Sequence, residues 1–230
     1  ARCVCCSQRY SASMDRGLWG GLVVMGDATV YGGTEEVDGL AGYYYGGSDD
    51  DDDSGTRSYV RVWHGGAAIG AGITFAGVGS GTSVDHVEVA FSLDDGVEFS
   101  GGTVNVKYLS VLFVGDDAFD SDKGYQGKGQ FLFAMLGVEG GHGTEMDNQN
   151  KIGGSNDVNS QPRSHPQFTS MTIIGDGTPQ STGDGGDALF AQVGEVGDLS
   201  IGIQGNLWFT EAWDHRVRVF NTNFQDLDLG

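Results

Sequence analysis

The sequence predicts an all-β fold in which short strands coil into a right-handed parallel solenoid. One observation behind this prediction is an internal repeat of 22 residues between positions 84 and 122. Apolar residues of the first copy recur in the second, Val84, Val87, Val89 and Phe91 being followed by Val106, Leu109, Val111 and Phe113. The other is the alternation of apolar and polar residues within each copy, which is typical of strands with one buried face. Because so short a repeat cannot bury its own apolar side, its copies must stack.

Composition favours strands and turns over helices. The 230 residues include 41 Gly and only three Pro. Gly recurs every few residues, and each helix-interior Gly costs about 1 kcal/mol relative to Ala. With 38% hydrophobic residues the chain is too apolar for disorder, and it lacks the three-residue period of collagen. We therefore expect a globular β protein.

The elements can be assigned in chain order. Residues 1–15 are irregular, and a first strand is expected from Leu18 to Met25. The segment at 59–62 then matches the one at 86–89, 27 residues later, and the segment at 72–75 matches 96–99 at a spacing of 24. Three successive turns of the solenoid can thus be recognised.

Stacking also predicts which side chains are neighbours. Equivalent residues of adjacent turns lie about 4.8 Å apart, the spacing of paired strands. Asp85 should lie beside Lys107, and His86 beside Tyr108, which are favourable pairs. Glu98 should lie beside Asp120, and this pair of like charges is unfavourable unless something neutralises it.

The pattern is interrupted over residues 137–168, a polar segment that we interpret as a long loop excursion. Strand patterns return at 171–174, 199–203, 207–209 and 217–220. The length would accommodate roughly seven to nine turns. We therefore expect a single parallel β-helix domain over residues 16–230, preceded by the irregular segment 1–15.

The charge of the chain limits its partners. Its formal net charge of −20 argues against nucleic acid and against anionic membranes, both of which require a basic surface. No apolar run reaches the roughly 20 residues of a transmembrane helix, and no signal-peptide pattern opens the chain. Cysteines occur only at Cys3, Cys5 and Cys6, so no disulfide framework holds the predicted repeats. Cations are the natural ligands of such a chain.

The strongest candidate site is a group of carboxylates that the repeat brings to one corner of adjacent turns. Its members are Asp94, Asp95, Glu98, Asp116, Asp117, Asp120 and Asp122. Closely spaced carboxylate oxygens suit Ca²⁺, which accepts six to eight oxygen ligands in flexible geometry. The competing interpretation is that Asp and Gly simply form the turns, because Asp side chains bond to local backbone amides.

The excursion also contains polar residues, among them His142 and Glu145, which would matter only if the excursion places them near a site. If the excursion covers the acidic corner, it forms one wall of a groove. Lys128 or Arg163 would then be the cation that holds an anionic sugar.

Several segments resemble a known family. They are Gly17–Val24, Tyr59–Gly66, Val87–Val89 with Leu93–Phe99, Gly101–Tyr108 and Gly127–Phe131. Together they resemble secreted or surface proteins with right-handed parallel β-helices, of the pectin-lyase-like type, found in marine bacteria and some algae. The resemblance covers residues 16–175 and implies a pectin-lyase-like fold outside the cell. It implies little about activity, because a fold shared with polysaccharide lyases does not establish a lyase.

Two functions remain open. The first is an extracellular or cell-surface structural module, adhesive or glycan-binding and stabilised by Ca²⁺, whose partners are polysaccharide or other copies of itself. The repetition, the acidity and the lack of a recognisable catalytic motif favour it. The alternative is a calcium-dependent polysaccharide lyase or a related glycan-active enzyme. In that enzyme the metal on the aspartates binds a uronate carboxylate, and Lys128 or Arg163 removes the proton next to it.

Overall fold

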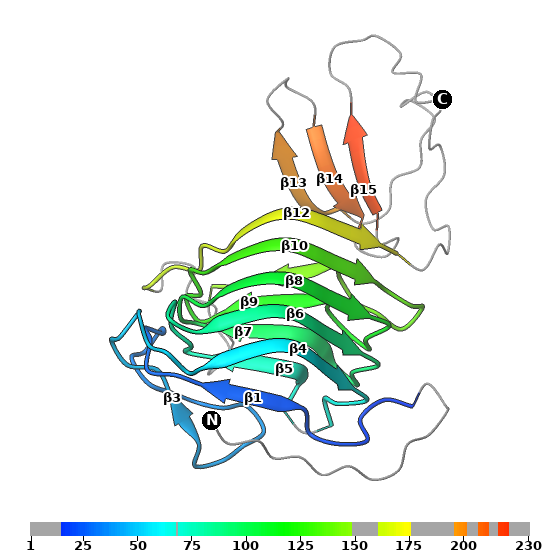
Figure 1. Cartoon of the computed structure of the whole chain (residues 1–230). Helices are drawn as coiled ribbons and strands as arrows, with labels where there is room; N and C mark the ends of the chain where they lie inside the picture. The colour runs from blue at the N-terminus through cyan, green and yellow to red at the C-terminus, as the bar shows by residue number, and fades with distance from the viewer. Residues whose placement is uncertain are drawn as a thin grey trace. The chain divides into compact units, whose positions relative to one another are not determined.

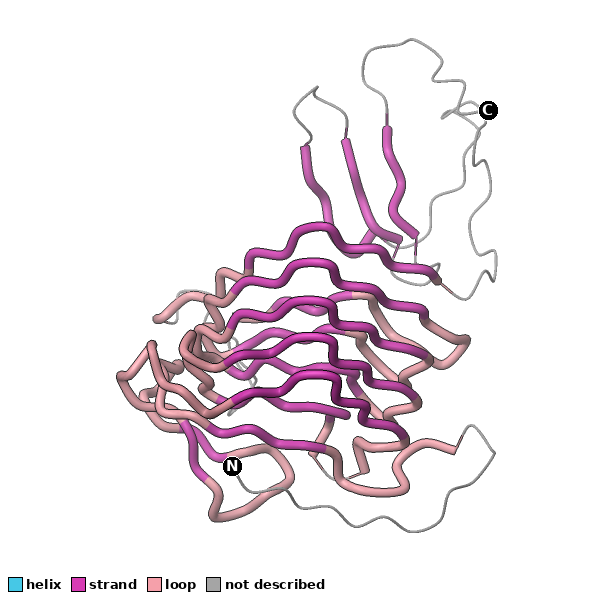
Figure 2. The backbone as a smooth tube through the Cα atoms, in the orientation of Figure 1, coloured by secondary structure: helices cyan, strands magenta, loops and turns pink. Residues whose placement is uncertain are grey.

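A computed structural model describes residues 15–67, 69–148 and 161–175, together with the backbone of three strands between 196 and 220 (Figure 1). All regular structure in these residues is β (Figure 2). No helix in the described part of the chain has the length and apolarity needed to cross a membrane. The chain divides into two compact units, 1–172 and 173–230.

Two parallel five-stranded sheets build the first unit. The strands of the first sheet are β1 (Leu22–Met25), β5 (Ala71–Ala76), β7 (Asp95–Ser100), β9 (Phe119–Asp122) and β11 (Thr144–Met146). Those of the second sheet are β4 (Thr56–Trp63), β6 (Ser83–Ala90), β8 (Asn105–Leu112), β10 (Lys128–Met135) and β12 (Gln167–Ile174). Because the chain alternates between the sheets, each turn contributes one strand to each. This is a parallel β-solenoid of about four turns, which confirms the predicted fold class.

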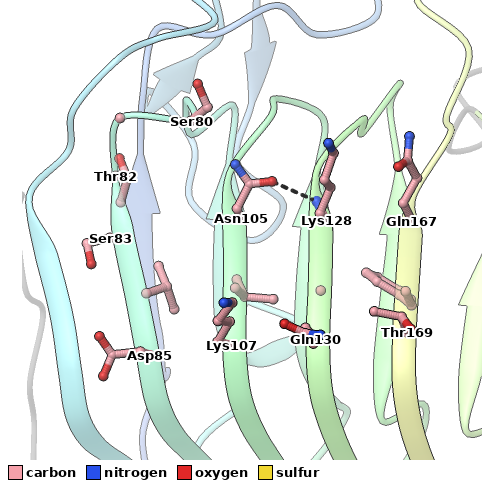
Figure 3. Close-up of a pocket in the computed structure, with 15 residues that line it drawn as sticks. Ser80, Thr82, Ser83, Asp85, Asn105, Lys107, Lys128, Gln130, Gln167 and Thr169 are labelled. Atoms are coloured by element: carbon pink, nitrogen blue, oxygen red, sulfur yellow. Dashed lines mark hydrogen bonds between the residues drawn. The ribbon is translucent and has the colours of Figure 1, made fainter.

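The strand register agrees with the sequence repeat. Asp85 lies opposite Lys107 in the second sheet (Figure 3), and Glu98 lies opposite Asp120 in the first. Val87 pairs with Leu109, and both side chains are buried in one core. The spacing of equivalent positions therefore corresponds to one turn of the solenoid, as predicted.

Each strand of the second sheet bends at one residue with a left-handed backbone. These residues are Tyr59, His86, Tyr108, Phe131 and Ser170, with φ between 49° and 61°. The first four carry rings, which stack on the outside with centroids 4.6, 4.6 and 5.0 Å apart. Left-handed geometry is uncommon for residues other than Gly, and ring stacking contributes about 0.5–1.5 kcal/mol per pair. We call Tyr59, His86, Tyr108 and Phe131 the aromatic ladder.

A second stack of rings lies inside the solenoid. Phe75 and Phe99, from adjacent strands of the first sheet, have centroids 5.7 Å apart, and Phe99 lies 4.7 Å from Tyr125. All three side chains are fully buried. The Tyr125 hydroxyl donates a hydrogen bond to the Val104 carbonyl at 2.9 Å, so its polar atom is satisfied.

The segment between β1 and β4 was not predicted to have strands. It contains β2 (Glu35–Glu36) and β3 (Tyr44–Tyr45), a short antiparallel pair. Val30, Val37 and Tyr45 from this segment pack against Ala76 of β5 in a small apolar cluster. The segment is therefore fixed to the first sheet and brings its own polar groups there.

Three details differ from the sequence prediction. About four turns are present instead of seven to nine. Strands β13 (Val196–Ile201), β14 (Leu207–Glu211) and β15 (Arg216–Phe220) form an antiparallel sheet, so they are not further turns of the solenoid. The expected excursion at 137–168 is not one continuous loop, because β11 pairs with β9 and β12 begins at Gln167. Residues 1–14 and 149–160 lie outside the described residues, and the single domain over 16–230 stays a prediction.

Candidate functional site

Acidic residues gather at the start of two neighbouring strands of the first sheet. Asp94 and Asp95 lie where the chain enters β7, and Asp116 and Asp117 lie just before β9. Because β7 and β9 are paired in parallel, the two doublets stack. The Asp95 Oδ1 atom accepts a hydrogen bond from the backbone N–H of Asp117 at 3.1 Å. The repeat thus brings residues 22 positions apart into contact, as predicted.

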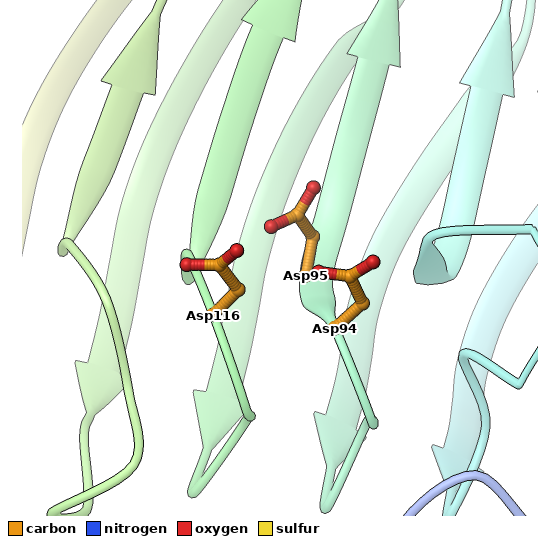
Figure 4. A group of neighbouring side chains, drawn as sticks. All are labelled: Asp94, Asp95 and Asp116. Atoms are coloured by element: carbon orange, nitrogen blue, oxygen red, sulfur yellow. The ribbon is translucent and has the colours of Figure 1, made fainter.

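Three of these carboxylates form a compact group, which we call the aspartate turn cluster. Its members are Asp94, Asp95 and Asp116 (Figure 4), each offering an oxygen within 4.8 Å of the others. Burial raises the Asp95 pKa to about 9; the hydrogen bond from the Asp117 backbone lowers it in part, and neighbouring negative charges raise it further. Burial also raises the pKa of Asp94 and of Asp116. The cluster therefore holds protons, or another cation, more tightly than isolated carboxylates do.

Asp117 has a different role, because its carboxylate binds His142, a residue that follows β9 in the chain. Its side chain is 2% exposed. The Asp117 Oδ1 atom accepts hydrogen bonds from the backbone N–H of His142 and, at 2.9 Å, from its Nδ1 atom in the tautomer protonated there. The imidazole is thereby oriented by a buried carboxylate. Burial, reinforced by a hydrogen bond with Asp117, raises the pKa of nearby Glu145 to about 7.

A line of carboxyl groups crosses the strands of the same sheet. Glu98 of β7, Asp120 of β9 and Glu145 of β11 occupy equivalent positions, and we call them the carboxyl row. Glu98 accepts hydrogen bonds from Thr74 at 3.0 Å and Ser100 at 2.7 Å, and its burial raises its pKa. Burial and the surrounding carboxylates raise the Asp120 pKa to about 10. Its buried Oδ1 atom has no protein partner among the described residues.

Asp122 lies at the end of β9 beside a buried lysine. Its side chain is 3% exposed, and its Oδ1 atom also has no partner in the described part of the chain. Burial and the charge of Glu98 raise the Asp122 pKa to about 8. Burial by itself would lower the pKa of Lys123, but Asp122, Tyr45 and Asp38 raise it above its ordinary value. The Lys123 Nζ atom lies 3.7 Å from an Asp38 carboxylate oxygen.

The seven predicted carboxylates do not share one corner, because Asp94 and Asp116 precede β7 and β9 whereas Asp122 ends β9. We call the seven together the acidic face, and it has three environments. These are the turn cluster, the His142-bound Asp117, and the group formed by Glu98, Asp120 and Asp122. Sequence reasoning missed Thr74, although the match between segments 72–75 and 96–99 aligns it with Glu98. It also missed the contact between Lys123 and Asp38, because no repeat relates the β1–β4 segment to β9.

Lys128 and Arg163 lie away from the aspartate turn cluster. Lys128 begins β10 in the second sheet, and the Arg163 carbonyl accepts a hydrogen bond from Gln126 at 3.4 Å. Both residues lie near the turn of the chain that follows Asp122. That turn begins six residues beyond Asp116, which is about 20 Å of extended chain at 3.3 Å per residue. The structure does not bring these two cations to the turn cluster.

The donors of the acidic face fit a hard cation. Three carboxylates of the turn cluster offer up to six oxygens, and Ca²⁺ takes six to eight oxygen ligands in flexible geometry. The partnerless buried oxygens of Asp120 and Asp122 are further potential ligands. Carboxyl groups that hold protons near neutral pH can exchange them for a metal ion.

Comparison with known proteins gives one match. Residues 4–213 match a family model described as a pectate-lyase-like β-helix domain. No curated protein and no solved structure was found to match. The family match spans most of the chain and agrees with the observed parallel solenoid. The chain therefore belongs to the family of pectate-lyase-like β-helix domains.

Proposed function

We propose that this chain is an extracellular or cell-surface structural module, adhesive or glycan-binding, whose acidic face takes up Ca²⁺. The observation that carries the proposal is the stacking of carboxyl groups on the first sheet, at the turn cluster and along the carboxyl row. Like charges directly opposed across strands destabilise a sheet. A divalent cation would remove this repulsion and join successive turns. An acidic, calcium-loaded solenoid suits a calcium-rich extracellular medium, and its partners are polysaccharide or other copies of the chain.

Calcium is expected to raise the melting temperature of the protein. A ligand that binds only the folded state stabilises it by about 2.7 kcal/mol at 100 times its dissociation constant, which is about 5–10 °C for a domain of this size. The Asp95→Asn/Asp116→Asn variant should lose most of this shift. The measurement is thermal unfolding at pH 8 in chelator and in millimolar Ca²⁺.

The matched control is Asp27→Asn, which changes an exposed carboxylate outside the acidic face. Its calcium shift should equal that of the unmodified protein. An identical melting curve with chelator and with Ca²⁺ would count against calcium as a ligand. Co-sedimentation with particulate matrix polysaccharides tests the adhesive role, which requires retention on at least one of them.

A second candidate function is a glycan-active enzyme, and a specific observation favours it. His142 is held by buried Asp117 next to Glu145, so an oriented imidazole and a carboxyl group with a pKa of about 7 lie together. Groups with a pKa near the working pH are suited to general acid–base catalysis. In a lyase, His142 would accept the proton next to a uronate carboxylate, and a cation on the turn cluster would stabilise the developing charge.

If the chain is a lyase, it should release unsaturated products from a uronate polymer. These products absorb in the ultraviolet. We expect His142→Gln to lower such an activity by about 10²–10⁴-fold, the usual contribution of a general acid or base. Lys128→Gln is the informative companion, because Lys128 begins a strand of the other sheet. If Lys128→Gln abolished the activity and His142→Gln did not, the assignment to His142 would be wrong. No product from any uronate polymer with Ca²⁺ would leave the structural module as the function.

A further inference from the structure

A buried lysine at the end of β9 faces an aspartate of the β1–β4 segment. The side chain of Lys123, which directly follows β9, is only 5% exposed, and Asp38 lies between β2 and β3. The Lys123 Nζ atom is 3.7 Å from the Asp38 Oδ2 atom. Among the carboxylates that the structure describes, Asp38 alone forms an ion pair with Lys123. An amine and a carboxyl group from distant parts of the sequence are therefore neighbours.

Backbone hydrogen bonds hold both partners in place. The Lys123 carbonyl accepts a hydrogen bond from the Tyr31 N–H at 2.8 Å, which ties the β1–β4 segment directly to this residue. Asp38 lies in a tight turn, in which the Leu40 N–H donates to the Val37 carbonyl at 3.0 Å, and Val37 is buried. The two side chains thus meet because their backbones are fixed, and the contact does not depend on a chance encounter of long side chains.

The surroundings of the pair are asymmetric. The buried ring of Tyr45 has its centroid 5.9 Å from the Lys123 Nζ atom, and its hydroxyl shares a hydrogen bond with Lys123. The side chain of Asp38, in contrast, is 59% exposed. The lysine is therefore shielded from solvent, whereas a small molecule released from the Asp38 carboxyl group can leave to water.

From this geometry we infer that Lys123 and Asp38 join in an intramolecular isopeptide bond, which links the β1–β4 segment covalently to the end of β9. Within the ion pair, a proton passes from the ammonium to the carboxylate and leaves a neutral amine beside a carboxylic acid. Burial of the lysine assists this transfer, because it disfavours the charged form. The Nζ atom then attacks the Asp38 Cγ atom, and the hydroxyl group leaves as water with a proton from the nitrogen.

The step is balanced without any other reactant. One C–N bond forms, one C–O bond breaks, one water molecule is released, and nothing is oxidised or reduced. The Tyr45 hydroxyl, already bonded to Lys123, can relay the proton from the nitrogen to the leaving oxygen.

Fixed proximity makes the condensation feasible. In dilute solution an amine and a carboxylic acid do not condense, but groups held in a reactive geometry reach effective concentrations of about 10⁵–10⁸ M. The bond closes a long loop of the chain and so restricts the unfolded state, as a disulfide does. It requires neither calcium nor a glycan, so the inference goes beyond the proposed function and does not depend on it.

The test follows the intact mass of the whole chain during refolding. Chain isolated in denaturant should have the full mass of its sequence. After refolding it should lose the mass of one water molecule, at a rate that does not depend on protein concentration. Protease digestion should then release a branched peptide that contains Lys123 and Asp38, and trypsin should no longer cleave after Lys123. A refolded chain that keeps its full mass would overturn the inference.

One side reaction has to be separated from the isopeptide bond. Asp38 is followed by Gly39, and an aspartyl–glycine sequence can lose water by closing a succinimide without any lysine. Lys123→Arg keeps the positive charge but supplies no amine nucleophile, so this variant should keep its full mass. The matched control is Lys128→Arg at an exposed lysine, which should lose water as the unmodified protein does. Water loss that persists in Lys123→Arg, without a branched peptide, would assign the change to the succinimide and contradict the isopeptide bond.

Discussion

Raising the pH from 5 to 9 in chelator is expected to lower the melting temperature by more than about 5–10 °C, because even one carboxyl that stays protonated only in the folded protein costs about 3 kcal/mol over two pH units. The groups responsible are carboxyls of the first sheet that are buried or half-buried. Asp122, Asp95 and Asp120 have pKa values of about 8, 9 and 10 in the folded protein, against an ordinary value of 3.8. These shifts arise mainly from burial, which disfavours the charged form.

The direction of the effect follows from proton binding. Between pH 4 and the folded-state pKa values, the folded protein holds protons that the unfolded chain has released. Stability therefore falls with rising pH across this range. The contribution of these groups is complete below about pH 4 and is lost as the pH passes through 8–10. This is the reverse of the usual behaviour of salt-bridged carboxylates, which stabilise a protein more as the pH rises.

Asp120→Asn provides the critical comparison, because an amide imitates the protonated carboxyl group without titrating. This variant should lose less stability between pH 5 and 9 than the unmodified protein. Asp27→Asn, at an exposed position, should leave the pH dependence unchanged. Calcium should also flatten the curve, since a bound cation replaces the protons. A melting temperature that rises steadily from pH 5 to 9 in chelator would show that the carboxyl groups are not buried together.

The sequence predicted the register of the central turns because side chains recur there at a constant spacing. Val87 and Leu109 share a core, and Glu98 faces Asp120, as the repeat required. The number of turns could not be predicted in the same way. Alternation of apolar and polar residues indicates a strand with one buried face, but it does not distinguish parallel from antiparallel pairing. Strand β15 has such an alternation and pairs antiparallel with β14.

Only those parts of the candidate site that lie within the sequence repeat could be predicted. The aspartate turn cluster follows from the two Asp doublets, which are one turn apart. Lys123 could not be linked to Asp38, because the β1–β4 segment docks on the first sheet through Val30 and Tyr45, without any repeated pattern. The aromatic ladder was only partly foreseen, as the pairing of His86 with Tyr108. Left-handed backbone at aromatic residues has no sequence signal comparable to that of Gly.

The inner ring stack is expected to carry a large share of the stability of the solenoid. We expect Phe99→Ala to lower the free energy of unfolding by about 3–5 kcal/mol, the usual cost of removing a buried aromatic side chain. Phe99 is fully buried and contacts rings on both sides, Phe75 at 5.7 Å and Tyr125 at 4.7 Å between centroids. Its loss leaves a cavity that the surrounding structure fills only in part.

Phe91→Ala is the matched control, because it makes the same change in the same turn of the solenoid. Phe91 also stacks, on His64 at 5.3 Å and Phe113 at 5.8 Å, but it is only partly buried. Its removal should cost about 1–3 kcal/mol, since it loses two ring contacts without opening a core cavity. Urea unfolding measures both values. Equal losses would mean that Phe99 does not lie inside the solenoid. The carboxyl row, whose members alternate with the inward-facing residues of the same strands, would then not be on one outer face.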